Sequence, residues 1–303
     1  MTRTFNTRMV FRTMGALLLL EAIFMAIAMG VSLWYKEADT GIFLISTIIT
    51  LLAGVIGLCI GRRAESRMGE REGYVIVAMV WVVFSAFGLL PYYLSGQVPT
   101  FTDAWFESMS GFSTTGATII PNLDVITHGL LFWRSLTQWI GGMGIIVLSI
   151  AILPIFGLNG MQLYAAEVTG LTYEKLSPRI SDTAKMMWTT YVILTASEIL
   201  GLWLCGMPIF DAVCHSFSTI ATGGFSTKNN SLEFYDSAAI HYLVTFFMFV
   251  SGINFVILIY LVSGKARNFF RDEEFRWYTV AVVLFSLLLT IGLYIARPGW
   301  TGL

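Results

Sequence analysis

Seven long apolar stretches alternate with shorter polar connections along the chain. Each is near or above the roughly 20 residues that an α-helix needs to cross a bilayer. The pattern therefore predicts an all-α polytopic membrane protein. The predicted spanning helices are Met14–Trp34, Gly41–Gly61, Gly73–Leu94, Leu130–Phe156, Ala184–Cys205, Ala239–Ser263 and Trp277–Ala296.

One stretch, Phe101–Ile119, is too polar to span a membrane and too apolar to be an ordinary external loop. It occurs twice, because a shift of 108 positions without a gap places Asp103 on Asp211 and Gly116 on Gly224. Internal repeats reveal architecture. The predicted unit is an apolar helix, a short re-entrant pore segment and a second apolar helix. The same shift aligns Ala104 with Ala212, Ser108 with Ser216, Ser110 with Ser218 and Thr114 with Thr222.

Composition supports the membrane assignment. The 303 residues are 56% hydrophobic and 12% charged, which is about half the charged fraction of a soluble domain. The apolar run that follows Arg12 is longer than the roughly 15 residues of a signal-peptide core, so we predict an uncleaved first helix.

Cys59, Cys205 and Cys214 have no pairing or metal-binding spacing, and we interpret them as small buried hydrophobes.

The distribution of basic residues predicts the orientation. Of the 18 Lys and Arg residues, 14 fall on one set of alternate loops. By the positive-inside rule these loops and the N-terminus are cytoplasmic. A full crossing at Phe101–Ile119 would invert every later loop and remove this bias. The pore segments are therefore predicted to enter from the extracellular or periplasmic side and to return to it.

The pore segments have the features of a cation site. Asp103 and Asp211 each stand where a short helix would begin, and a carboxylate there caps free backbone N–H groups. About ten helical residues extend roughly 15 Å, so the negative helix end points at the membrane centre. Gly then permits carbonyls to face an axis, and Thr adds hydroxyl ligands for a monovalent cation. The predicted filter residues are Thr114, Thr115, Gly116, Ala117, Thr118, Thr222, Gly223, Gly224 and Phe225.

Four acidic residues are expected near the outer mouth, where they would raise the local concentration of cations. They are Asp103, Glu107, Asp124 and Asp211. In the alternative interpretation the two segments are surface hairpins in which Gly and Thr only form turns. The ungapped repeat, the half-bilayer length and the charge-derived topology favour the pore.

Four passages carry a family resemblance: FESMSGFSTTGATI, LFWRSLTQWIGGMGIIVLSIAILP, AEVTGLTYEKLSPRISDTAKMMW and HSFSTIATGGFSTKNNS. They resemble the TrkH family, the membrane subunits of bacterial Trk potassium-uptake systems, within the Trk/Ktr/HKT superfamily. The resemblance covers essentially the whole chain, including an extra helix pair before the first pore unit.

The resemblance implies uptake of K+ (and Rb+) across the bacterial cytoplasmic membrane, with no organic cofactor. Gly116 and Gly224 match the filter glycines, and Thr114, Thr115, Thr222 and Gly223 would also contact K+. It further implies a homodimer gated by a cytoplasmic, nucleotide-binding TrkA ring. The mixed-charge segments 157–183 and 265–276 are either a docking surface for that ring or simply solvated.

The family has four helix–pore-loop–helix units in one chain, whereas this sequence contains two and the first helix of a third. We therefore expect a fragment of a longer product; a half-protein that assembles with another chain is the alternative. The predicted divisions are a two-helix extension (1–72), a first repeat (73–157), a cytoplasmic linker (158–183), a second repeat (184–264) and an incomplete third repeat with its linker (265–303).

Several polar residues in apolar helices have alternative interpretations. For Glu21 and Glu198, packing or an interhelical hydrogen bond is favoured over a place on the ion path. Asn254 is expected either to face a cavity or to bond a neighbouring helix. The glycines of 141–144 indicate close helix packing or a bend, because no strand precedes them as in a phosphate site.

Arg134, near the outer end of its predicted helix, is expected to snorkel rather than to block the pore. His128, His215 and His241 have no spacing for a metal site or for acid–base catalysis. A structural or filter-supporting role is expected for His215, which occupies a pore helix.

Three classes of function follow. The leading one is a K+-translocating, channel-like subunit. The second is an assembly or regulatory subunit that does not conduct alone, which the two missing filter loops favour. An intramembrane enzyme is disfavoured, because no Asp pair, Ser/His pair or HExxH motif is present.

Overall fold

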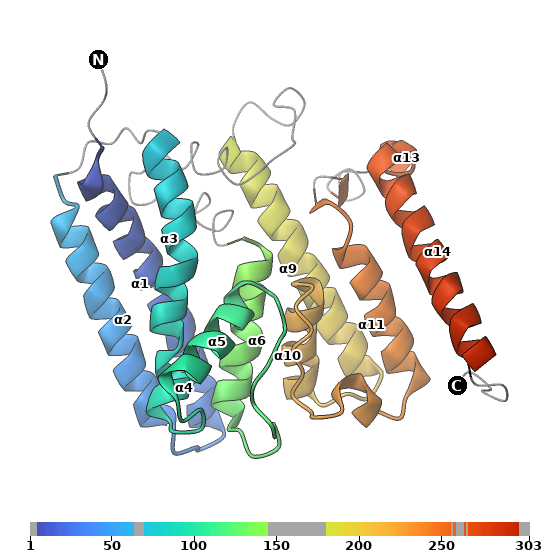
Figure 1. Cartoon of the computed structure of the whole chain (residues 1–303), viewed down its shortest axis with the longest axis horizontal. Coiled ribbons are helices and arrows are strands. Elements are labelled where there is room, and N and C mark those ends of the chain that lie inside the picture. Colours follow the sequence, from blue (N-terminus) through green and yellow to red (C-terminus); the bar gives the residue numbers. More distant parts are fainter. Residues whose placement is uncertain are drawn as a thin grey trace. The chain divides into compact units, whose positions relative to one another are not determined.

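The computed structural model describes residues 5–63, 70–144, 180–255, 257–258, 264 and 266–296, which contain helices and loops but no strand. Contacts divide the chain into two compact units, residues 1–248 and 249–303, and each is described by itself. The helices of the first unit (Figure 1) are α1 (Thr7–Trp34), α2 (Thr40–Ile60), α3 (Glu70–Gly88), α4 (Leu90–Leu94), α5 (Phe101–Phe112), α6 (His128–Gly142), α9 (Ile180–Leu204), α10 (Ile209–Ile220), the 3-10 turn η2 (Ser231–Phe234) and most of α11 (Ala238–Ser251).

Five helices of the described residues are long and apolar enough to cross a membrane. They are Thr7–Trp34, Thr40–Ile60, Arg71–Leu94, Lys185–Leu204 and Glu273–Ala296. Each corresponds to a predicted span, although α1 begins seven residues earlier than predicted. The prediction of an all-α polytopic membrane protein is confirmed.

The other two predicted spans, Leu130–Phe156 and Ala239–Ser263, are not continuous helices. Helix α6 ends at Gly142, where Gly144 has a φ of +65° that an α-helix does not contain. Helix α11 ends at Ser251, before a turn at Gly252. Gly144 and Gly252 are related by the same 108-residue shift as the pore segments, so the interruption repeats as well. Residues 145–156 lie outside the described residues.

Helix α6 is central to the first unit, since it packs against α1, α5 and α10. Glycine permits its closest approaches. A Cβ on Gly141 would overlap the carbonyl oxygen of Phe112, the last residue of α5, and a Cβ on Gly142 would lie 2.5 Å from the Cα of Ala221, which follows α10. The prediction of close packing at these glycines is confirmed, and both short helices end against α6.

The loop between α1 and α2 caps α6. The Glu37 carboxylate accepts hydrogen bonds from the backbone N–H groups of His128 (2.8 Å) and Gly129 (3.0 Å). Asp39 accepts from the hydroxyls of Ser32 and of Thr127, the latter at 2.5 Å. Free N–H groups at a helix start need such acceptors. The extra helix pair is thereby fixed to the helix that supports the pore segments.

Helices α1 and α2 pack through glycine. A Cβ on Gly15 would lie 2.6 Å from the carbonyl oxygen of Gly54 and 2.6 Å from the backbone nitrogen of Leu58. Small residues allow backbones to approach in this way when no hydrophobic effect drives helices together in lipid.

Gly15→Ala is therefore expected to lower the melting temperature of the detergent-solubilised chain by several degrees, because backbone atoms must move to admit the methyl group. Gly30→Ala is the matched control in the same helix, since a Cβ there has no atom within 4 Å. Equal melting temperatures for the two variants would contradict this packing.

In the second unit, α13 (Ala266–Arg271) precedes α14 (Glu273–Ala296), and no residue of α14 is buried. The Tyr278 hydroxyl donates to the carbonyl of Phe249 at 3.0 Å, and the two rings stack. The Asn254 side chain donates to the Glu274 carboxylate at 3.2 Å. Of the two expectations for Asn254, the structure favours a bond to a neighbouring helix.

The structure also tests the predicted burial of two acidic residues and three cysteines. Glu21 and Glu198 are both fully buried inside α1 and α9. Cys214 is buried as predicted, but Cys59 is exposed and Cys205 is half-buried. The interpretation of all three cysteines as buried hydrophobes was wrong for Cys59, which lies exposed in the last turn of α2.

Candidate functional site

The two short helices predicted from the repeat are present, and each has 12 residues. Neither Asp begins its helix, however, because Asp103 and Asp211 are each the third residue. The Thr100 hydroxyl caps α5 by accepting from the backbone N–H of Asp103 at 3.1 Å. Both carboxylates still lie in the first turn, where negative charge suits the helix dipole.

The Thr–Gly segment after each short helix has an unusual backbone, and it is the same in both copies. Thr114 and Gly116 have φ of +52° and +73°, and Thr222 and Gly224 have φ of +54° and +81°. Positive φ at a β-branched residue is strained and usually marks a functional constraint. Sequence reasoning anticipated glycine at these segments but not the strain at the two threonines.

The two segments lie against each other. A Cβ on Gly116 would overlap the carbonyl oxygen of Gly223. A Cβ on Gly223 would in turn lie 2.6 Å from the side-chain nitrogen of Gln138 on α6. A Cβ on Gly224 would have no atom within 4 Å, so this glycine borders open space. Thr115, Ala117, Thr118 and Thr222 are exposed, whereas the side chain of Phe225 is buried.

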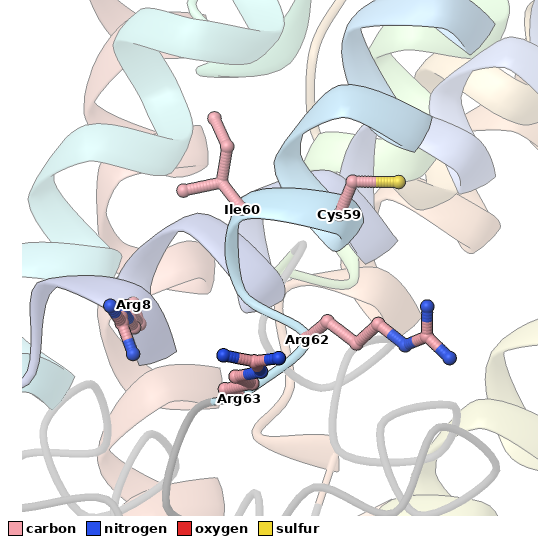
Figure 2. Close-up of a pocket in the computed structure, with 5 residues that line it drawn as sticks. All are labelled: Arg8, Cys59, Ile60, Arg62 and Arg63. Atoms are coloured by element: carbon pink, nitrogen blue, oxygen red, sulfur yellow. The ribbon is translucent and has the colours of Figure 1, made fainter.

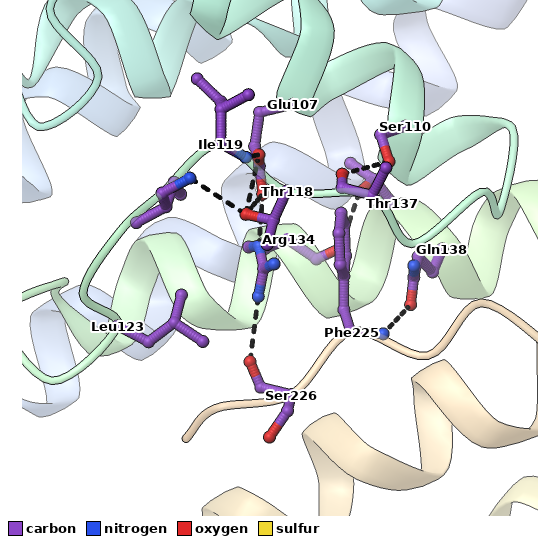
Figure 3. Close-up of polar contacts among 12 residues, drawn as sticks. Glu107, Ser110, Thr118, Ile119, Leu123, Arg134, Thr137, Gln138, Phe225 and Ser226 are labelled. Carbon is purple, nitrogen blue, oxygen red and sulfur yellow. Dashed lines mark hydrogen bonds and ion pairs between the residues drawn. The ribbon is translucent and has the colours of Figure 1, made fainter. Parts of the chain in front are cut away.

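A buried ion pair supports both segments from α6 (Figure 3). Arg134 is 2% exposed and donates from Nε to the fully buried Glu107 carboxylate at 2.5 Å. Glu107 also accepts from the Thr118 hydroxyl (3.0 Å) and from the backbone N–H of Ile119 (3.2 Å). The pair therefore holds the end of the first Thr–Gly segment.

The same arginine reaches the second segment. Its Nη1 donates to the carbonyl of Ser226 at 2.9 Å, and its guanidinium lies 3.7 Å above the centre of the Phe225 ring. Gln138, one turn further along α6, accepts from the backbone N–H of Phe225 at 3.1 Å. Figure 3 shows these contacts converging from α6 on both segments. Sequence reasoning missed Gln138, and its position one helical turn after Arg134 is the only sequence signal for it.

Two predictions about charge were wrong. Arg134 does not snorkel, because its buried guanidinium is paired with the Glu107 carboxylate and does not need to reach water. Glu107 is not an outer-mouth acid, since its charge is buried and balanced by Arg134. Asp211 is also buried; it accepts from the Thr227 hydroxyl at 2.6 Å and lies 3.7 Å from the Lys228 ammonium. Of the four acids, Asp124 is exposed and Asp103 is half-buried.

His215 supports the second segment, as expected. Its ring nitrogens lie 2.9 Å from the carbonyl of Asp211 and 3.1 Å from the Ser226 hydroxyl. In the loops that follow the two segments, Asn229 accepts from the backbone N–H of Leu123 at 2.8 Å and donates to Asp124 at 3.0 Å. The two loops are therefore joined through α6 at the Thr–Gly segments and through Asn229 in the residues that follow them.

The donor set of the site consists of backbone carbonyls and Thr hydroxyls, which suit a monovalent cation such as K+. Among the described residues there is no group of three or more His, Cys, Asp or Glu side chains that could hold a metal ion.

Comparison with known proteins agrees with this geometry. Residues 28–295 match the family described as TrkH, cation transport protein. The Trk system potassium uptake protein TrkH of Salmonella typhimurium is 42% identical over 290 residues, which cover 95% of this chain and 60% of that protein. TrkG of Escherichia coli, also a Trk system potassium uptake protein, is 34% identical over 295 residues, covering 96% and 59%.

The crystal structure of the potassium transporter TrkH from Vibrio parahaemolyticus superimposes with a TM-score of 0.84 at 35% identity. The match covers 98% of this chain and 61% of that one. The chain thus spans about 60% of the length of the curated relatives it matches. Since the family match extends over most of the chain, the protein belongs to the TrkH family of cation transport proteins.

Proposed function

We propose that the chain forms part of the K+ pathway of a Trk-type uptake system in the bacterial cytoplasmic membrane. The observation that carries the proposal is the repeated backbone: two Thr–Gly segments with the same positive φ values, apposed at Gly116 and Gly223. Alternating negative and positive φ directs successive carbonyls to one side of a segment, which is the arrangement that replaces the hydration shell of K+. The similar proteins are potassium uptake proteins by name.

In this proposal Thr114–Thr118 and Thr222–Phe225 supply two parts of a four-part filter. K+ contacts carbonyls or hydroxyls of Thr114, Thr115, Gly116, Thr222, Gly223 and Gly224. Two segments leave part of an ion's surroundings open, so further pore segments are required to enclose it. Glu107, Arg134 and Gln138 are positioning residues that keep the two segments in register.

The proposed topology places the N-terminus in the cytoplasm and the pore segments on the periplasmic side. It rests on the positive-inside rule, because Arg62, Arg63 and Arg71 flank the α2–α3 connection. We also propose the division into a helix pair, two helix–pore-loop–helix repeats and the first helix of a third unit. Because of the family resemblance, we also propose that the protein forms a homodimer and binds a TrkA-type cytoplasmic ring.

The second candidate is a subunit that assembles with other pore segments but conducts nothing alone, which the presence of only two Thr–Gly segments among the described residues favours. Rb+ uptake into proteoliposomes separates the candidates. The 303-residue chain should give no selective flux, whereas the longest gene product that contains it should take up Rb+ and exclude Na+. Absence of Rb+ flux from the longer product would contradict the proposed function.

A further inference from the structure

A basic pocket opens where α1 begins and α2 ends (Figure 2). Its cavity has a volume of about 440 Å³ and is lined by Arg8, Cys59, Ile60, Arg62 and Arg63. Among the described residues, no carboxylate forms an ion pair with any of the three arginines. The pocket therefore presents three positive charges that form no ion pair in the part of the chain that the structure describes. The Glu72 carboxylate, which accepts from the backbone N–H of Asn6 at 2.8 Å, is not among its lining residues.

An apolar groove adjoins this pocket. Its volume is about 510 Å³, and Ile60 lines both cavities. Residues of three helices form it, including Phe11 from α1, Ile56 from α2 and Met79 from α3. Along α1 it extends from Thr7 to Leu18, which is about 16 Å at 1.5 Å per residue. That length is close to the roughly 15 Å hydrocarbon depth of one bilayer leaflet.

We propose that the pocket and groove together bind one anionic phospholipid. The phosphate would lie among Arg8, Arg62 and Arg63, because guanidinium groups bind phosphate oxygens through paired N–H donors. One acyl chain would follow the groove from Ile60 toward Leu18. Charge complementarity selects an anionic head group, and the shared residue Ile60 connects that head group to the chain.

A basic loop at a membrane surface is expected from topology alone, since positive residues are retained on the cytoplasmic side. Two features distinguish this site from that general bias. The arginines come from two chain segments, the start of α1 and the turn after α2, and they line one cavity. The cavity also shares Ile60 with a groove about one leaflet deep. The occupant is therefore a lipid rather than a free phosphate, which would leave the groove unused.

Native mass spectrometry of the purified 303-residue chain in a neutral detergent tests the proposal. The probes are phosphatidylglycerol and phosphatidylcholine with the same 16-carbon and 18-carbon chains. Arg62→Gln/Arg63→Gln should weaken phosphatidylglycerol binding at least about tenfold, since each basic residue near an anionic lipid surface contributes about fivefold. Phosphatidylcholine, whose positive choline group offsets its phosphate charge, should bind the unsubstituted chain more weakly and should lose less affinity than phosphatidylglycerol.

The matched control is Arg267→Gln/Arg271→Gln, which removes the same charge from another basic segment and should change neither affinity by more than about twofold. Unchanged phosphatidylglycerol binding in Arg62→Gln/Arg63→Gln would overturn the proposal. The four substituted arginines are all exposed, so folding should be retained in both variants. Melting temperatures of the two variants check this.

Ala53→Trp tests the groove separately, because Ala53 lines only the apolar cavity. It should weaken binding of the long-chain phosphatidylglycerol and leave binding of the dihexanoyl form unchanged. If glycerol phosphate competes as well as the long-chain lipid, the site binds free phosphate and the lipid assignment is wrong. These measurements need no ion flux, so their result is independent of the proposed K+ transport.

Discussion

Gly116→Ala, made in the longest gene product that contains this chain, is expected to lower the K+ over Na+ permeability ratio by about tenfold or more. The added methyl group would overlap the carbonyl oxygen of Gly223, so the second Thr–Gly segment must move. The φ of +73° at Gly116 adds strain for any L side chain. A tenfold change corresponds to only about 1.4 kcal/mol, which is within the cost of one strained residue.

Two glycines serve as controls for this experiment. Gly96 has a φ of +70° and open space around its Cβ position, and it lies in the loop after α4. Gly96→Ala therefore introduces the same backbone strain without the collision and should leave the permeability ratio unchanged. Gly224→Ser, at a φ of +81° in open space, should lower the ratio less than Gly116→Ser. An unchanged ratio in Gly116→Ala would contradict the apposition of the two segments at the filter.

Arg134→Gln is expected to destabilise the chain by about 3–5 kcal/mol, because it leaves the Glu107 carboxylate buried without its counter-charge. Arg134 and Glu107 are 2% and 0% exposed at their side chains, so water cannot replace the missing partner. The melting temperature of the detergent-solubilised protein should fall by at least about 5 °C. In the longest gene product that contains this chain, Arg134→Gln should also lower Rb+ selectivity, since Arg134 holds the carbonyl of Ser226.

A double-mutant cycle isolates the ion pair from these other contacts. Arg134→Gln/Glu107→Gln should recover part of the stability lost in either single variant, because two neutral amides can share a hydrogen bond. Lys228→Gln is the control, since it also removes one positive charge. The half-buried Lys228 ammonium lies 3.7 Å from Asp211, so this substitution should lower the free energy of unfolding by about 1 kcal/mol or less. Strict additivity of the two single variants would show that the pair has no coupling.

The spanning helices and the two short helices α5 and α10 could be predicted because hydrophobic length and an ungapped repeat are properties of the sequence itself. The interruptions at Gly144 and Gly252 could not, since glycine within an apolar run is compatible with either close packing or a break. Both occur here: Gly141 and Gly142 permit close packing on α5 and α10, while Gly144 takes a positive φ.

The positions of the two Thr–Gly segments could be predicted from the repeat, and their role as a filter stays a prediction, whereas the polar network behind them could not be predicted. Arg134 and Glu107 are 27 positions apart, and Arg134 and Ser226 are 92 apart. Hydrophobic periodicity carries no information about such polar pairs. An arginine at a predicted helix end is therefore compatible with snorkelling until the fold brings a buried carboxylate to it. The caps from Glu37 to His128 and Gly129 were missed for the same reason.

The most direct test of the filter assignment is the position of a bound cation. Tl+ replaces K+ at carbonyl sites and is located by its anomalous scattering in a crystal of the longest gene product that contains this chain. We predict Tl+ between the segments Thr114–Thr118 and Thr222–Phe225, in contact with carbonyl oxygens of both. Tl+ bound elsewhere in the protein, with none between these two segments, would contradict the filter assignment.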